Sequence, residues 1–173
     1  MLMEANTMKQ PNKPAATDIA LTPNRFPWPP IIYAAAILIG ALSKFVLPTP
    51  WIESPGSDFL FAIGVLIIVT GLTLDIRAMQ TLHAAKTTIL PIKGADHLVT
   101  SGPFKISRNP IYLGNTLLTF GAGLVFGIIW FLPLAFIAAL LTSKLAIERE
   151  EAHLSAKFGK NWRDYAQKVR RWF

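Results

Sequence analysis

One segment of the chain combines residue types from which a binding site can be built. It reads Asp96-His-Leu-Val-Thr-Ser-Gly-Pro-Phe-Lys-Ile-Ser-Arg-Asn-Pro-Ile-Tyr-Leu-Gly114. Gly102-Pro103 predicts a turn, and Asn109-Pro110 predicts a helix start, where the missing proline N–H costs nothing. The free N–H groups at that start, together with Arg108, form a potential site for a carboxylate. The alternative is a loop that only caps the next helix.

A second cluster, Glu148-Arg149-Glu150-Glu151, follows the apolar region that comes next in the chain. Acidic residues at the C-terminal end of a helix run against the usual preference for cations at that end. One interpretation is a solvated turn in which Glu148 pairs with Arg149. The other is that one carboxylate points back beneath the helices, toward the 96–114 segment.

Several other site types are not expected. The glycines between Gly121 and Gly127 follow no strand, so they predict close helix packing rather than a dinucleotide loop. The three histidines share no short ligand spacing, so no metal site is expected. The absence of cysteine excludes disulfides and a cysteine nucleophile. The formal charge of +7 does not predict nucleic-acid binding, because the basic residues flank apolar spans instead of forming one patch.

The elements that carry these clusters are apolar helices. Hydrophobic residues make up 52% of the chain and charged residues only 16%, which favours a membrane protein. Spans are expected at about 30–47 and 57–77. The next 35 residues, between Arg108 and Lys144, carry no charge. One helix of that length would measure about 52 Å, against a hydrocarbon core of about 30 Å. We therefore expect a hairpin of spans at about 110–127 and 130–148, with its turn at Gly127 to Pro133 and Trp130 as an interfacial anchor.

The predicted fold is thus an all-α integral membrane protein with about four transmembrane helices. The loop between the first two spans carries Glu53 and Asp58 but no Lys or Arg. The segment between the second and third spans is basic, and so is the segment after the fourth. The positive-inside rule then places both termini in the cytoplasm. Residues 1–27 are polar and predict a disordered arm.

The C-terminal segment, 149–173, carries an amphipathic stripe that is expected to be interrupted near Gly159. Apolar residues recur there at steps of three or four, namely Leu154, Phe158, Trp162, Tyr165, Val169 and Trp172. This spacing is typical of one helix face. The segment is expected either to lie in the headgroup layer or to pack over the 96–114 loop.

About the last 90 residues resemble the membrane methyltransferases grouped around isoprenylcysteine carboxyl methyltransferase and the phospholipid N-methyltransferases. The first two spans match only in being apolar. The residues that carry the resemblance are Leu98-Val-Thr-Ser-Gly-Pro-Phe104, Arg108-Asn-Pro-Ile-Tyr112, Gly114, Glu150-Glu151, Leu154, Phe158-Gly159, Tyr165 and Val169.

The resemblance implies that residues 28–173 form a membrane methyltransferase domain with S-adenosylmethionine as donor. The donor site would be formed by the loop, the ends of the membrane helices and the C-terminal amphipathic segment. By position, the cofactor contacts would fall on Asp96, His97, Leu98, Val99, Phe104, Asn109, Pro110, Ile111, Tyr112 and Glu151.

Catalytic roles would fall on Glu151, Arg108 and Glu150. Glu151 would orient the cofactor or the acceptor, Arg108 would hold the loop or a carboxylate, and either glutamate is a plausible base. The chain departs from the prenylcysteine enzymes at Ala146 and Ile147, where those enzymes carry arginine, so prenylcysteine methylation is expected to be weak or absent.

The expected function is methyl transfer to a lipophilic or membrane-delivered acceptor, which is a carboxylate, a thiol or an amine. The expected partners are the lipid bilayer and this lipophilic or small-molecule acceptor. A hypothesis from another class is a non-catalytic membrane protein that binds a partner or lipid headgroups through its basic loop and tail.

Overall fold

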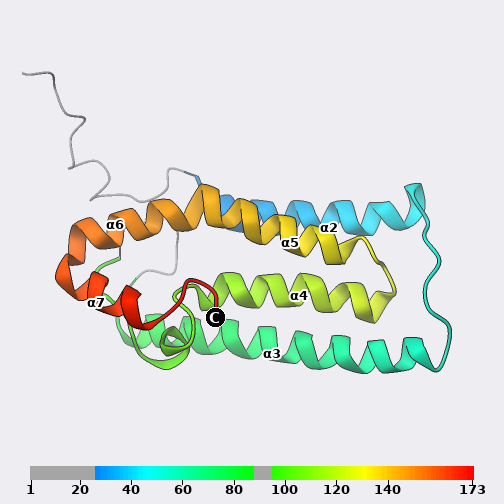
Figure 1. Ribbon diagram of the computed structural model, residues 1–173, viewed down its shortest axis with the longest axis horizontal. Helices are drawn as coiled ribbons and strands as arrows, with labels where there is room; N and C mark the ends of the chain where they lie inside the picture. Colours follow the sequence, from blue (N-terminus) through cyan, green and yellow to red (C-terminus); the bar gives the residue numbers. More distant parts are fainter. Residues whose placement is uncertain (1–25, 88–94) are drawn as a thin grey trace, which may run out of the picture.

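The computed structural model describes residues 26–87 and 95–173, and the described residues form helices without any strand. Of the arm predicted at residues 1–27, residues 1–25 lie outside the described residues. Figure 1 shows α2, α3, α4 and α5 side by side, with α6 and α7 beyond one end, called here the site end. The elements are α2 (Trp28–Val46), α3 (Gly56–Ala84), η1 (Gly102–Lys105), α4 (Pro110–Phe126), α5 (Phe131–Thr142), η2 (Ser143–Ile147), α6 (Glu148–Phe158) and α7 (Lys160–Lys168).

Three helical stretches are long and apolar enough to cross a membrane, namely α2, α3 and the continuous stretch Phe131–Phe158, and α4 is a shorter apolar helix. The all-α membrane fold is therefore confirmed. The second span was expected to end at about residue 77, but α3 continues to Ala84. Its 29 residues measure about 44 Å, which is longer than the hydrocarbon core of about 30 Å. The last turns of α3 reach the site end.

The predicted hairpin between α4 and α5 is present. Gly127 ends α4 with a φ of 62°, in the left-handed region that favours glycine. Trp130 donates a hydrogen bond from Nε1 to the carbonyl oxygen of Leu47, 3.0 Å away, which joins the turn to the end of α2. The turn is shorter than expected, because Pro133 already lies in the first turn of α5, where the lack of an N–H is tolerated.

Glycines on α3 and α4 allow these two helices to pack closely. A Cβ atom built on Gly71 would lie 2.9 Å from the carbonyl oxygen of Gly114, and the reverse distance is also 2.9 Å. The pair Gly64 and Gly121 shows the same reciprocal 2.9 Å approach. Such small-residue contacts are common between membrane helices. The predicted packing role is thus confirmed for Gly121.

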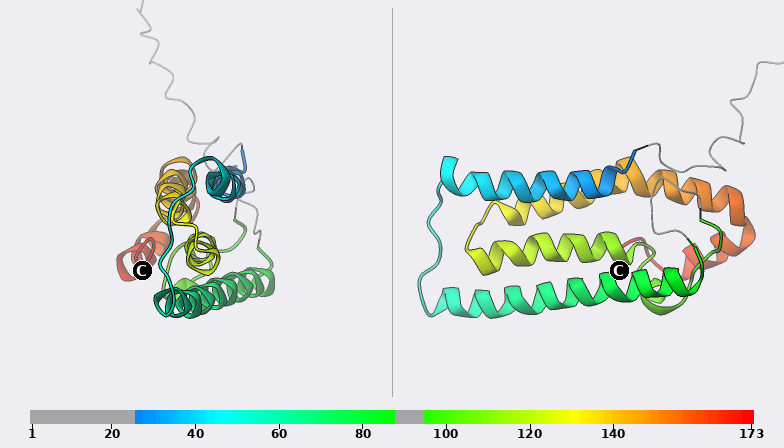
Figure 2. Two further views of the ribbon diagram at one scale, coloured as in Figure 1. Left: turned by 90° about the vertical axis from the view of Figure 1, so that its right-hand side faces the viewer. Right: turned by 180° about the vertical axis from the view of Figure 1, so that it is seen from behind.

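The stretch after α5 does not stop at the membrane boundary expected near residue 148. Instead, α5 passes through the π-helical turn η2 into α6 without a break in the helix. Gly159, with a φ of 53°, then separates α6 from α7, and the chain folds back toward the start of α4 (Figures 1 and 2). Trp162 and Tyr165 of α7 are buried, and the Tyr165 hydroxyl donates a 2.7 Å hydrogen bond to the carbonyl oxygen of Phe104. The amphipathic segment therefore packs over the loop.

Candidate active site

A cavity of about 600 Å³ lies at the site end of the bundle. Its walls come from the start of α2, the last turns of α3, the loop that leads into α4, the first turns of α4, and α6 and α7. Most of the residues predicted from sequence line this cavity, namely Leu98, Val99, Phe104, Arg108, Asn109, Pro110, Ile111, Tyr112, Glu150 and Glu151. Residues from two motifs that lie about 40 positions apart in sequence are thus brought to one site.

Two of the predicted cofactor residues do not lie in the wall. Asp96 and His97 are exposed, and the cavity is lined beside them by Ala95 and Leu98. The backbone N–H groups of Asp96 and His97 point toward the Thr87 hydroxyl, at 3.0 and 3.4 Å. These backbone contacts join the loop to Thr87, and both residues lie outside the cavity wall.

Glu151 is held between two arginines. Its Oε1 lies 2.9 Å from Nη2 of Arg108. Arg171, from the segment after α7, reaches the same carboxylate with Nη2 at 2.6 Å from Oε2 and with Nε at 3.2 Å from Oε1. The Glu151 side chain is only 18% exposed, so these contacts are partly shielded from water. The hydrogen bonds to Glu151 also raise the pKa of Arg171 above its ordinary value.

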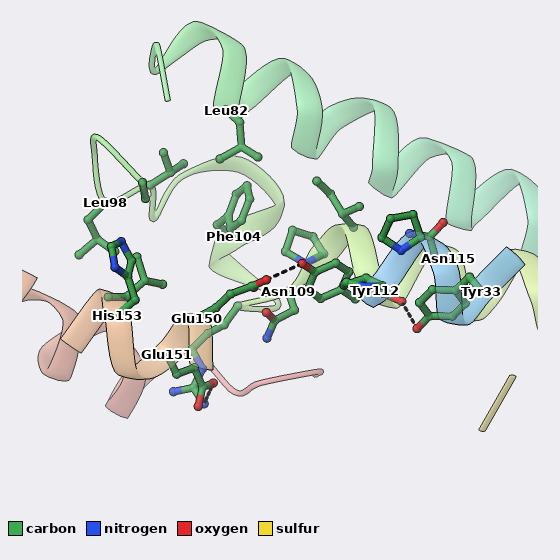
Figure 3. Close-up of a pocket in the computed structure, with 18 of the residues that line it drawn as sticks. Tyr33, Leu82, Leu98, Phe104, Asn109, Tyr112, Asn115, Glu150, Glu151 and His153 are labelled. Carbon is green, nitrogen blue, oxygen red and sulfur yellow. Dashed lines mark hydrogen bonds and ion pairs between the residues drawn. The ribbon is translucent and has the colours of Figure 1, made fainter. Parts of the chain in front are cut away.

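Glu150 occupies a different environment from its neighbour. It accepts a 2.7 Å hydrogen bond from the hydroxyl of Tyr112, which joins α6 to the first turn of α4. The hydroxyl of Tyr33, on α2, donates to the carbonyl oxygen of Tyr112 at 3.0 Å and lies 2.6 Å from the hydroxyl of Thr116. Figure 3 shows Glu150, Tyr112 and Tyr33 in a row along the cavity. The three helices are thereby connected through polar groups next to the cavity.

Arg108 holds the loop, as one of its two predicted roles requires. Its backbone N–H donates to the carbonyl oxygen of Arg170 at 3.0 Å, and Nη1 donates to that of Ala166 at 3.2 Å. Its guanidinium lies over the Trp162 ring, 5.5 Å from the centroid. Among the described residues, no hydrogen-bond partner is found for its buried Nε.

The first residue of the acidic cluster, Glu148, does not line the cavity, although its Oε1 lies 3.9 Å from Nη1 of Arg171. Glu148 pairs with Lys144, one turn earlier in the helix, at 2.7 Å between Nζ and Oε1, and both side chains are largely exposed. The proposed turn with a Glu148–Arg149 pair is wrong, because the helix continues through these residues and Glu148 faces Lys144. The interpretation that one carboxylate of the cluster points back toward the loop is confirmed by Glu151 and Arg108.

Several wall residues were not predicted from the sequence as site residues. Tyr33 and Asn115 lie on helices whose sequences indicate only apolar membrane spans. His153 is also buried in the wall, and its position just after the acidic cluster gave no sign of this. Trp162 and Tyr165 belong to the amphipathic stripe, whose spacing predicted that they share a helix face but not that they line the cavity. Burial raises the pKa of Tyr165 to about 12, and its hydroxyl donates a hydrogen bond to the carbonyl oxygen of Phe104.

One protein-family model matches most of the helices described above. A family model described as phospholipid methyltransferase matches residues 59–161, from the first turn of α3 to the start of α7. The comparison with curated proteins gave no match. The match extends over more than half of the chain, and it includes both motifs that meet at the cavity. The chain is therefore an integral membrane protein that belongs to the phospholipid methyltransferase family, within the isoprenylcysteine carboxyl methyltransferase-like group.

Proposed function

We propose that the cavity binds S-adenosylmethionine and that the protein transfers its methyl group to a lipophilic acceptor delivered by the membrane. The observation that carries this proposal is the meeting of the two family motifs, Arg108 to Tyr112 and Glu150 to Glu151, around one cavity. Its volume of about 600 Å³ lies in the range of about 300–1,000 Å³ that is usual for small-molecule sites.

The chemistry of the walls fits this donor. Leu98, Val99 and Phe104 provide an apolar surface on the loop side, suited to the faces of an adenine ring. The carboxylate of Glu150 also lines the cavity and complements a positively charged sulfonium. The guanidinium of Arg108 lines the same cavity and complements the carboxylate of the methionyl part in charge.

When bound, the donor supplies an electrophilic methyl group, and its carbon–sulfur bond breaks as the bond to the acceptor forms, which leaves S-adenosylhomocysteine. Such a transfer depends on alignment and on exclusion of water. In this chain, α7 and the loop cover the cavity at the site end of the bundle. The hydrogen bond from the Tyr165 hydroxyl to the carbonyl oxygen of Phe104 joins these two elements. An amine or thiol acceptor also loses a proton, and Glu150 is the carboxylate placed to receive it, since Glu151 is engaged by two guanidinium groups.

The acceptor enters from the lipid side of α2. Ala34 and Ile37 line the cavity and are also exposed on the surface of the bundle, with Ile37 48% exposed. Because α2 is long and apolar enough to cross a membrane, we place this part of the cavity wall next to the lipid. A chain-bearing acceptor can therefore place its headgroup beside Tyr33 and Glu150 while its apolar part stays in the bilayer.

Binding of S-adenosylhomocysteine to the purified protein in lipid nanodiscs, measured by calorimetry, tests the donor. We expect saturable binding at micromolar concentrations. Labelled methyl groups from the donor, followed into membrane lipid and into small acceptors, then identify the acceptor class. Failure of the protein to bind the product and to transfer label would contradict the proposal and favour the non-catalytic alternative.

A further inference from the structure

The segment after α7, residues 169–173, packs on the turn that leads into α4. The Arg171 carbonyl oxygen accepts hydrogen bonds from the Ser107 hydroxyl at 3.2 Å and from Asn109 Nδ2 at 3.0 Å. The carbonyl oxygen of Arg170 accepts from the backbone N–H of Arg108 at 3.0 Å. One wall of the cavity is thus held by backbone carbonyls that lie about 60 positions later in the chain.

The side chain of Arg171 makes a separate contribution. It reaches Glu151 with two nitrogens, Nη2 at 2.6 Å and Nε at 3.2 Å, so that each contacts a different carboxylate oxygen. A guanidinium bound in this forked manner fixes the plane of the carboxylate as well as its charge. Arg108 contacts the same carboxylate through Nη2, at 2.9 Å from Oε1.

Arg171 does not itself line the cavity, whereas both Glu151 and Arg108 do. We propose that Arg171 is a positioning residue for the methyl donor site. It fixes the plane of the Glu151 carboxylate, and through Glu151 it keeps the Arg108 guanidinium in the cavity wall. This inference rests on the proposed function and deepens it, because it assigns a role to a residue that touches neither donor nor acceptor.

A double-mutant cycle tests this role with the full chain in nanodiscs and S-adenosylhomocysteine as the probe. Arg171→Gln removes the fork but leaves the backbone carbonyl that bonds to Ser107 and Asn109. Loss of one charge-assisted contact of this kind weakens binding about 10- to 100-fold. We expect a loss of this size for R171Q and a smaller loss for R171K, which keeps the charge but not the fork. Arg170→Gln is the matched control, because it removes the same charge from an exposed neighbour.

The decisive comparison uses Glu151→Gln. If Arg171 acts through Glu151, adding R171Q to E151Q causes no further loss of affinity. Additive losses, or equal affinity of R171Q and the unmodified protein, overturn the inference while the proposed function stands. Absence of binding by the unmodified protein overturns the proposed function itself, and the inference with it.

Discussion

The hydroxyl of Tyr112, in the first turn of α4, donates a 2.7 Å hydrogen bond to Glu150 on α6. This bond joins the two family motifs inside the cavity. It also distinguishes Glu150 from Glu151, which is engaged by two arginines at 2.9 and 2.6 Å. The two adjacent carboxylates therefore have different partners, a tyrosine hydroxyl for Glu150 and two guanidinium groups for Glu151, and we propose that only Glu150 meets the acceptor.

Glu150→Gln should lower methyl transfer while leaving the fold intact. The substitution keeps the volume of the side chain but removes the charge and the proton acceptor. We expect a loss of about 2–4 kcal/mol of transition-state stabilisation, the scale found when one positioned polar group is removed. The measurement is kcat/KM for labelled methyl transfer, with the donor below saturation. Asp164→Asn is the control, because it removes one charge from an exposed ion pair with Lys160 outside the cavity, and such a pair contributes about 0–1 kcal/mol. Equal losses for both variants would contradict the assignment.

Tyr112→Phe should have a smaller effect in the same assay. It removes one hydrogen bond to Glu150 and leaves the ring and the backbone carbonyl that binds Tyr33 in place. A hydrogen bond to a charged group contributes about 1.5–3 kcal/mol. The double variant with Glu150→Gln should lose less than the sum of the two single losses, because the partners share one bond. Strict additivity would show that the two residues act independently.

Gly64→Val should destabilise the membrane bundle without touching the site. A Cβ atom at this position would lie 2.9 Å from the backbone oxygen of Gly121, so α3 and α4 must separate. Overpacking of this kind costs about 1–3 kcal/mol. Ala62→Val is the matched control, because Ala62 lies two residues away on the exposed face of α3. We expect a lower thermal unfolding temperature in detergent for Gly64→Val only, and similar temperatures for the two variants would refute the close-packing role.

The orientation of the chain stays a prediction and is directly testable. The sequence contains no cysteine, so single cysteines at Glu53 and Lys157 can be labelled without background. Both residues are exposed; Glu53 belongs to the loop between α2 and α3, and Lys157 belongs to α6. Figure 1 shows this loop and α6 at opposite ends of the bundle. The loop charges predict that an impermeant maleimide labels position 157 from the cytoplasmic side and position 53 from the other side. The reverse pattern would invert the topology.

Methylation of a prenylated cysteine is expected to be weak or absent. Ala146 and Ile147, at the positions where the resemblance leads us to expect arginine, are fully buried in η2. Lys144 is exposed and pairs with Glu148, and both Arg108 and Arg171 are engaged by Glu151. The acceptor carboxylate thus lacks a dedicated cation from this turn. Incubation with a farnesylated cysteine analogue and labelled donor provides the test, and rapid turnover by the unmodified protein would show the reasoning to be wrong.

The sequence by itself determined the membrane helices and the two motifs. The uncharged stretch of 35 residues is too long for one span, and Gly127 lies where the chain must reverse. Both features follow from length and local backbone preference, which require no knowledge of neighbouring helices.

The tertiary structure decided which side chains meet. The bond from Tyr33 to Tyr112 joins residues 79 positions apart, and the fork from Arg171 to Glu151 depends on the reversal at Gly159. The periodicity of a helix shows which residues share a face, but the residue that each one contacts depends on how the helices pack. The family resemblance placed Asp96 and His97 among the cofactor residues, but only the folded loop shows that these two residues are exposed and lie outside the cavity wall.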